Sequence, residues 1–181
     1  MEQTRKPNLF TLLFVTVFSF ASIFYIIIAT NTGNLRWFLP NSEFDKPTRI
    51  IISDYGERKI ITAEHSEYQL LADAVNESIS DLDNTDLVPI GLSATTIEDY
   101  ESKSFVIEVH YPRPISFNTL FRTGNPTKIL IPIEGRHSKD RLFFRGKRDE
   151  WWFGGMRMVT ANPIYDVLNE VGYPEITNPN S

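Results

Sequence analysis

The chain has 181 residues, a formal net charge of −5 and no cysteine. Without cysteine it can form neither disulfides nor thiolate metal sites, and it cannot carry a lipid on a cysteine. An acidic chain is a poor ligand for nucleic acid, so no nucleic-acid partner is expected. The length beyond the first 30 residues suits one domain with its own hydrophobic core.

An uncharged segment of 21 residues, Leu9–Ala29, contains fourteen Leu, Ile, Phe or Val residues. As a helix it would be about 31 Å long, which matches the hydrocarbon core of a bilayer. We therefore predict a single transmembrane helix that binds the lipid bilayer and remains attached as a signal-anchor. The alternative is a cleaved signal peptide, but its apolar core is shorter, and Ile27 is too bulky for a cleavage site after Ala29.

The charges that flank this segment predict its orientation. Arg5 and Lys6 precede it, and only Arg36 closely follows it. Because the flank richer in Lys and Arg stays inside, residues 1–8 are expected to be a cytoplasmic tail, and the rest of the chain is expected outside the cytoplasmic membrane. An exported domain without disulfides is typical of a bacterial envelope.

Residues 30–47 are rich in Asn, Gly and Pro and predict a juxtamembrane linker. The extracytoplasmic domain is expected to span residues 48–175. It begins with two β-branched segments, 49–53 and 58–62, which predict a β-hairpin with Gly56 at the position that needs a positive φ.

A helix is predicted over residues 64–83 because apolar residues recur there at spacings of three and four: Tyr68, Leu71, Val75, Ile79 and Leu82. Residues 83–103 are polar and rich in turn formers, with at most a short strand at 87–90. Residues 104–111 alternate between apolar and polar side chains, which predicts a half-buried strand.

Three further strands are predicted at 128–134, 141–145 and 150–153. Pro132 lacks an amide proton, so the first of them is expected at a sheet edge or with a bulge. Residues 136–148 hold six basic residues and one acid. This basic hairpin could bind an anionic partner or face the acidic half of the same molecule, residues 41–103, which hold fourteen Asp or Glu and five Lys or Arg.

A closing helix is predicted to start with Asn162 as N-cap and to end at Gly172. Residues 176–181 are expected to form a flexible tail. The predicted fold class is α+β: one N-terminal transmembrane helix, followed by a small extracytoplasmic domain with an antiparallel sheet and two helices packed on one face.

The most suggestive surface combines cations with aromatic rings, which together can stack on sugars or hold the side chains of a partner. We predict a ligand- or partner-binding surface formed by Arg145, Lys147, Arg148, Trp151, Trp152 and Arg157. The alternative is structural, with one tryptophan in the core and the other covering it.

Catalytic motifs, metal-binding motifs and nucleotide-binding loops do not occur in the sequence, so no catalytic residue, metal or cofactor is predicted. Glu108 and His110 share one face of a strand and could join His65 or Glu134 in a metal or hydrolase site. The main functional hypothesis is a non-catalytic binding or regulatory module that contacts a membrane or envelope protein, or an anionic envelope polymer. An envelope hydrolase and a structural subunit of a membrane complex are the alternatives.

Overall fold

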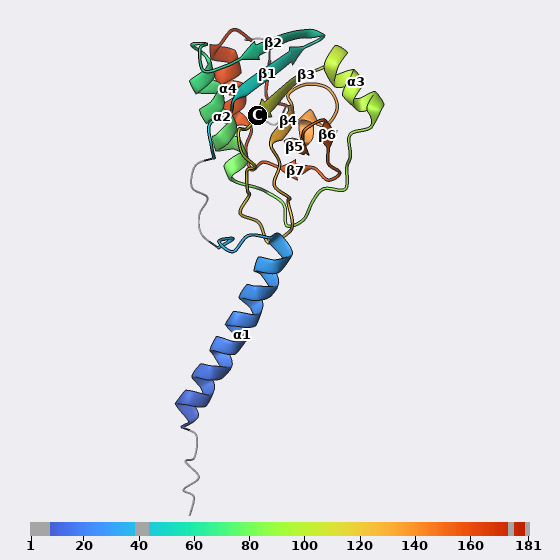
Figure 1. Cartoon of the computed structure of the whole chain (residues 1–181). Helices are drawn as coiled ribbons and strands as arrows, with labels where there is room; N and C mark the ends of the chain where they lie inside the picture. The colour runs from blue at the N-terminus through green and yellow to red at the C-terminus, as the bar shows by residue number, and fades with distance from the viewer. Residues whose placement is uncertain (1–7, 39–43, 174–175, 180–181) are drawn as a thin grey trace, which may run out of the picture.

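The computed structural model describes residues 8–38, 44–173 and 176–179. In this part of the chain, a long N-terminal helix, α1 (Leu9–Thr32), projects from an α+β body (Figure 1). The Asn8 side chain caps the start of α1 by accepting a hydrogen bond from the Phe10 amide. Gly33, with φ of 71°, ends it. Since α1 is long and apolar enough to cross a membrane, it is a candidate membrane span or signal sequence.

Antiparallel strands of the body form one seven-stranded sheet, within which a path runs in the order β2-β1-β3-β4-β5-β6, and β7 pairs with β5. The strands are β1 (Arg49–Asp54), β2 (Glu57–Ile61), β3 (Phe105–His110), β4 (Lys128–Pro132), β5 (Leu142–Lys147), β6 (Glu150–Trp151) and β7 (Met156–Arg157). A 3-10 turn, Ser138–Asp140, lies in the connection between β4 and β5.

The hairpin of β1 and β2 confirms the sequence prediction. Asp54 pairs with Glu57, which leaves Tyr55 and Gly56 as the two turn residues. Both have positive φ, 44° and 99° respectively. Two positive values are the pattern of a type I′ turn, whose twist matches that of the strands it joins.

Two helices, α2 (Tyr68–Ser80) and α4 (Asn162–Glu170), cover one face of the sheet. Their apolar stripes pack with the inward residues of the central strands into the main core. Leu71, Val75 and Ile79 of α2 are fully buried, as their helical spacing predicted. The α+β class with two helices on one face is therefore confirmed.

The opposite face carries a helix that the sequence analysis did not predict, α3 (Ala94–Ser102). Tyr100 from this helix packs with Val106, Leu130 and Phe144 in a second, smaller core. Only Thr96 and Tyr100 of α3 are buried, so the segment has no repeating apolar pattern from which a helix could be identified. The usable signal was the N-cap Ser93, whose hydroxyl accepts a hydrogen bond from the Thr96 amide.

Pro132 does not mark an edge strand, because β4 lies between β3 and β5. It is tolerated at the end of β4, beyond Leu130, the last residue paired with β5. Immediately after it, the amides of Ile133 and Glu134 both donate to the Phe105 carbonyl. Two amides on one carbonyl are the arrangement of a β-bulge, the other environment expected for this proline.

Two details at the C-terminal end differ from expectation. Ala161, not Asn162, occupies the N-cap of α4, and Asn162 is the first helical residue. Its side chain instead accepts a hydrogen bond from Asn178 at 2.5 Å. Ile176, expected in a flexible tail, is only 6% exposed because its apolar side chain packs in the main core.

Candidate functional site

One transverse row of residues runs across five neighbouring strands. The directly opposed residues are Arg49, His110, Lys128, Gly146 and Trp151, one each from β1, β3, β4, β5 and β6. Directly opposed residues of a sheet share a face, so this row combines three basic side chains with an indole on one surface.

Gly146 makes room for the centre of the row. A Cβ at this position would lie 2.8 Å from the Trp151 ring and 2.9 Å from Cε of Lys128. Both distances are too short for real contacts, so only glycine lets the two side chains meet above β5. The Lys128 ammonium lies 4.0 Å from the centroid of a Trp151 ring, in a cation–π contact.

Lys128 is a buried cation, with 6% of its surface exposed. Burial lowers the pKa of its ammonium group, while the nearby carboxylates of Glu108 and Asp149 act in the opposite direction. The ion pairs found among the described residues do not include Lys128. A buried ammonium that contacts an aromatic ring and has no directly paired carboxylate among the described residues can gain from an additional anion.

Glu108 and His110 lie side by side on β3. The Nε2 atom of His110 is 2.8 Å from a carboxylate oxygen of Glu108, and a guanidinium nitrogen of Arg58 is 3.8 Å from the other oxygen. Burial raises the pKa of Glu108, but the contacts with His110, Lys128 and Arg58 outweigh it and leave the pKa below its ordinary value. Glu108 is therefore held as an anion among cations.

A cavity of about 650 Å³ opens over this end of the sheet. We call it the cationic cavity; its lining residues are Thr48, Arg49, Arg58, Glu108, His110, Tyr111, Thr127, Lys128, Arg148 and Asp149. Four of them, the three arginines and Lys128, are cations, against two carboxylates. Even with His110 neutral, the lining has an excess of positive charge.

Three of the predicted site residues gather beside this cavity. Lys147, Arg148 and Trp152 line a neighbouring hollow of about 460 Å³ together with Asp149 and Glu150. Arg148 and Asp149, the turn between β5 and β6, line both spaces. Trp151 belongs to the row and partly covers the second core, whereas Trp152 packs against Gly124.

Arg145 is a structural residue in this fold. It is 2% exposed, and its guanidinium donates hydrogen bonds to the carbonyls of Thr123, Phe153 and Gly154. Burial lowers its pKa to about 10. The side chain thus ties the loop before β4 to the segment after β6 and has little surface for a ligand.

Arg157, the remaining predicted site residue, lines a different hollow, formed mainly by residues 82–89. In the same part of the molecule, the Arg141 guanidinium pairs with the Asp83 carboxylate at 3.1 Å. Among the residues that the structure describes, the basic hairpin therefore makes one ion pair with the acidic half of the chain, while Lys147 and Arg148 remain exposed.

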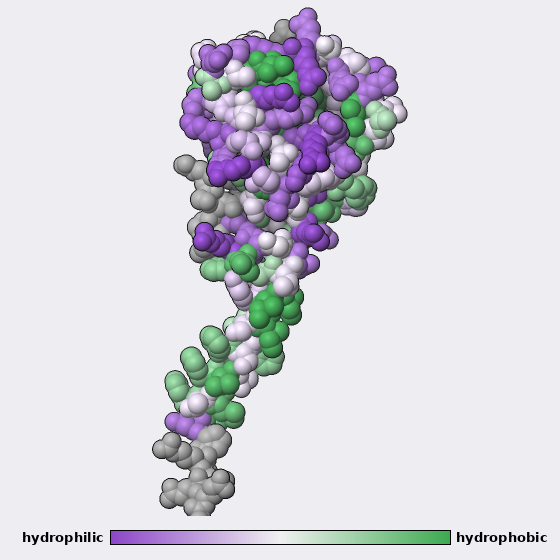
Figure 2. Space-filling view, in the orientation of Figure 1, coloured by the Kyte–Doolittle hydropathy of each residue, from purple (hydrophilic) through white to green (hydrophobic). Residues whose placement is uncertain are grey.

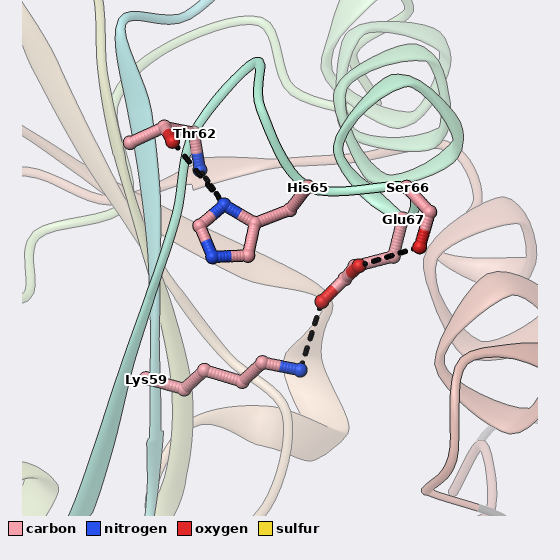
Figure 3. A network of polar contacts seen from close by, with 5 residues as sticks. All are labelled: Lys59, Thr62, His65, Ser66 and Glu67. Atoms are coloured by element: carbon pink, nitrogen blue, oxygen red, sulfur yellow. Dashed lines mark hydrogen bonds and ion pairs between the residues drawn. The ribbon is translucent and has the colours of Figure 1, made fainter.

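The residues suggested for a hydrolase or metal site do not converge. Glu134 accepts a hydrogen bond from the Tyr55 hydroxyl beside the start of β3, whereas Glu108 and His110 lie towards its end, about 10–17 Å away at 3.3–3.4 Å per residue. Figure 3 shows the His65 ring turned towards Thr62, whose amide donates to it. Groups of three or more metal-binding side chains are absent from the described residues.

Figure 3 also shows what the neighbouring acid does. Glu67 immediately precedes α2 and points towards Lys59 of β2, whose ammonium lies 2.8 Å from a carboxylate oxygen. Ser66 donates a hydrogen bond to the same carboxylate. The cluster joins the start of α2 to the edge strand and is a structural contact.

Comparison of the chain with protein families, with characterised proteins and with solved structures finds no match. The geometry of the cationic cavity is therefore the basis for assigning a function. Its central residues, Arg49, Arg58 and Lys128, were not among the predicted site residues, because they belong to separate strands and meet only through the strand order.

Proposed function

We propose that the protein is a single-pass, membrane-anchored binding module whose extracytoplasmic body binds an anionic envelope ligand in the cationic cavity. The observation that carries this proposal is the position of Lys128, a buried ammonium that contacts the Trp151 ring and lines a cavity together with three arginines. An anionic ligand would stabilise the Lys128 ammonium and so compensate for the hydration that the ammonium loses on burial.

The chemistry of the lining favours phosphate-bearing ligands. Arginine guanidinium groups present planar pairs of donors that match phosphate oxygens. Arg49, Arg58 and Arg148 are all exposed, and they reach the cavity from different elements. Three guanidinium groups around one buried ammonium can contact several phosphates of a polymer, so an anionic envelope polymer is the proposed ligand class.

Binding, rather than catalysis, is proposed because the candidate acid–base residues already contact other side chains and do not meet in one site. His110 contacts Glu108, and Glu134 lies at the other end of β3 in contact with Tyr55. The proposed side of the membrane follows from the charges that flank α1, with Arg5 and Lys6 on the cytoplasmic side and the body outside, as in a bacterial cytoplasmic membrane.

A titration with inorganic polyphosphate tests the proposed ligand class. The full chain is held in nanodiscs of neutral phosphatidylcholine, so that lipid headgroups do not compete, and binding is followed by calorimetry. We expect saturable binding that Lys128→Met weakens by roughly tenfold or more, since hydrogen bonds to charged groups contribute about 1.5–3 kcal/mol.

Lys139→Met is the matched control, because Lys139 is an exposed lysine of the β4–β5 connection, outside the cavity lining. It should leave the affinity unchanged. Equal affinities of the Lys128→Met variant and the original chain, or no binding by either, would reject the cavity as a polyphosphate site.

A further inference from the structure

The chain folds back along α1 immediately after leaving it. Beyond Gly33, the Trp37 ring meets Phe24 edge-on at 6.4 Å between centroids, and Phe38 meets Tyr25 at 6.0 Å. The Tyr25 hydroxyl donates to the Leu35 carbonyl at 2.8 Å. Residues 34–38 thus lie beside the last turns of the helix and do not extend away from it.

The length of the apolar segment sets a depth for the end of α1. Tryptophan and the other amphipathic aromatics favour the boundary between acyl chains and headgroups. The predicted span Leu9–Ala29 already matches the thickness of the hydrocarbon core, so the helix end at Thr32 is only about 4.5 Å further out, at 1.5 Å per residue. The last turns of α1 are therefore within the headgroup layer or close to it.

A loop of the body meets the chain at this depth. The Asn34 side-chain amide lies 3.5 Å from the Ser116 hydroxyl and 3.5 Å from the Asn118 side-chain oxygen. Figure 1 shows the connection between β3 and β4 descending from the sheet to the end of α1. We call residues 116–122 of this connection the membrane-proximal loop.

The membrane-proximal loop presents an apolar side chain on a fixed frame. Leu120 is 59% exposed, although its neighbours Thr119 and Phe121 are each 8% exposed. The Thr119 hydroxyl donates to the Phe121 carbonyl at 2.7 Å, which links the two residues on either side of Leu120. Leu120 therefore points outward from a packed segment, and the exposed cation Arg122 follows it.

We propose that the membrane-proximal loop rests on the bilayer and inserts Leu120 among the lipid headgroups. This inference relies on the proposed anchoring by α1, and it adds a second contact between the body and the membrane. Leu35 and Phe38, which are 69% and 58% exposed, lie on the returning chain that meets the loop through Asn34.

Lipid is the occupant that fits this surface. In Figure 2 the apolar surface of α1 continues onto the base of the body, where the polar surface begins. An exposed leucine two residues before an exposed arginine matches the headgroup region, which offers acyl carbons below and phosphates above. A bilayer that surrounds α1 would reach this loop without any further partner.

The absence of cysteine permits a test with single labels. Cysteine is introduced in the full chain at Leu120, at Phe38 or at Lys103, labelled with the environment-sensitive fluorophore NBD, and reconstituted into phosphatidylcholine–phosphatidylglycerol vesicles. A fraction of the lipids carries a nitroxide in the headgroup, which quenches nearby NBD. Lys103 is the control, because it is exposed beside α3, away from α1 in Figure 1.

We expect the Leu120 label to lose most of its fluorescence, as the Phe38 label should, while the Lys103 label keeps its own. If the Phe38 label is quenched but the Leu120 label stays as bright as that at Lys103, the proposed contact of the loop with the bilayer is wrong and the proposed anchor stands. If the Phe38 label is not quenched, both the proposed membrane anchoring by α1 and the proposed contact of the loop with the bilayer are wrong.

Discussion

The ammonium of Lys128 on β4 lies 4.0 Å from the centroid of a Trp151 ring on β6, two strands away. The strand between them carries Gly146 at the paired position, so no side chain separates cation from ring. Lys128 thereby contributes a buried positive charge to the lining of the cationic cavity, on which the proposed function depends.

Gly146→Ala should disrupt that contact. Its Cβ would also lie 2.4 Å from the Glu150 carbonyl oxygen, so the backbone or both side chains must shift, and overpacking of this kind costs about 1–3 kcal/mol of unfolding free energy. Urea denaturation in detergent micelles measures the loss. Gly155→Ala is the matched control, because its Cβ would meet neighbours at ordinary distances of 3.6–3.7 Å; equal stabilities of the two variants would contradict the steric argument.

Arg145→Met should destabilise the body strongly, even when no ligand is bound. The change removes the buried donor of three carbonyl groups, and a broken buried polar network of this kind costs about 3 kcal/mol or more. The neighbouring variant Lys147→Met alters an exposed side chain and should change stability by less than about 0.5 kcal/mol. A denaturation midpoint for Arg145→Met equal to that of Lys147→Met would show that the guanidinium is not structural.

The ion pair of Glu67 with Lys59 predicts an acid dependence of stability. The hydrogen bond from the Lys59 ammonium lowers the pKa of Glu67 to about 2, from an ordinary value of 4.5. Because folding lowers this pKa, the contribution is complete above about pH 4.5 and is lost as the pH falls towards 2. Glu67→Gln should therefore reduce stability at neutral pH by up to about 1 kcal/mol, as expected for a partly exposed pair.

The pH profile of the same variant provides the check. The stability difference between Glu67→Gln and the original chain, measured by urea denaturation, should shrink as the pH falls through that range. Glu77→Gln, at an exposed position of α2, should show no such convergence. A constant difference for Glu67→Gln from neutral to acid pH would contradict the assignment.

Much of the fold could be predicted because its signals are local. The three isoleucines of β1, the alternation along β3 and the apolar stripe of α2 each lie within one element. The isoleucines are buried on both faces of β1, and the stripe marks the buried side of α2. α3 was missed because a short helix that buries only Thr96 and Tyr100 has almost no period to detect.

The candidate site could be predicted only in part, for a topological reason. Lys147, Arg148 and Trp152 are neighbours in sequence, so a basic and aromatic cluster was visible before the structure. Arg49 and Lys128 come together because β3 lies between β1 and β4, and the order of strands cannot be read from any single segment. Arg145 resembled its exposed neighbours in the sequence, but the loops on either side bury it.

The position of the body relative to the membrane is tested most directly by labelling single cysteines in intact cells with a membrane-impermeant maleimide. We predict that Lys103→Cys, in the body, reacts without permeabilisation, and that Gln3→Cys, in the N-terminal tail, reacts only after it, with the full-length chain retained in the membrane fraction. The reverse labelling pattern, or recovery of the body in the aqueous fraction with a shortened N-terminus, would contradict a membrane-anchored extracytoplasmic module.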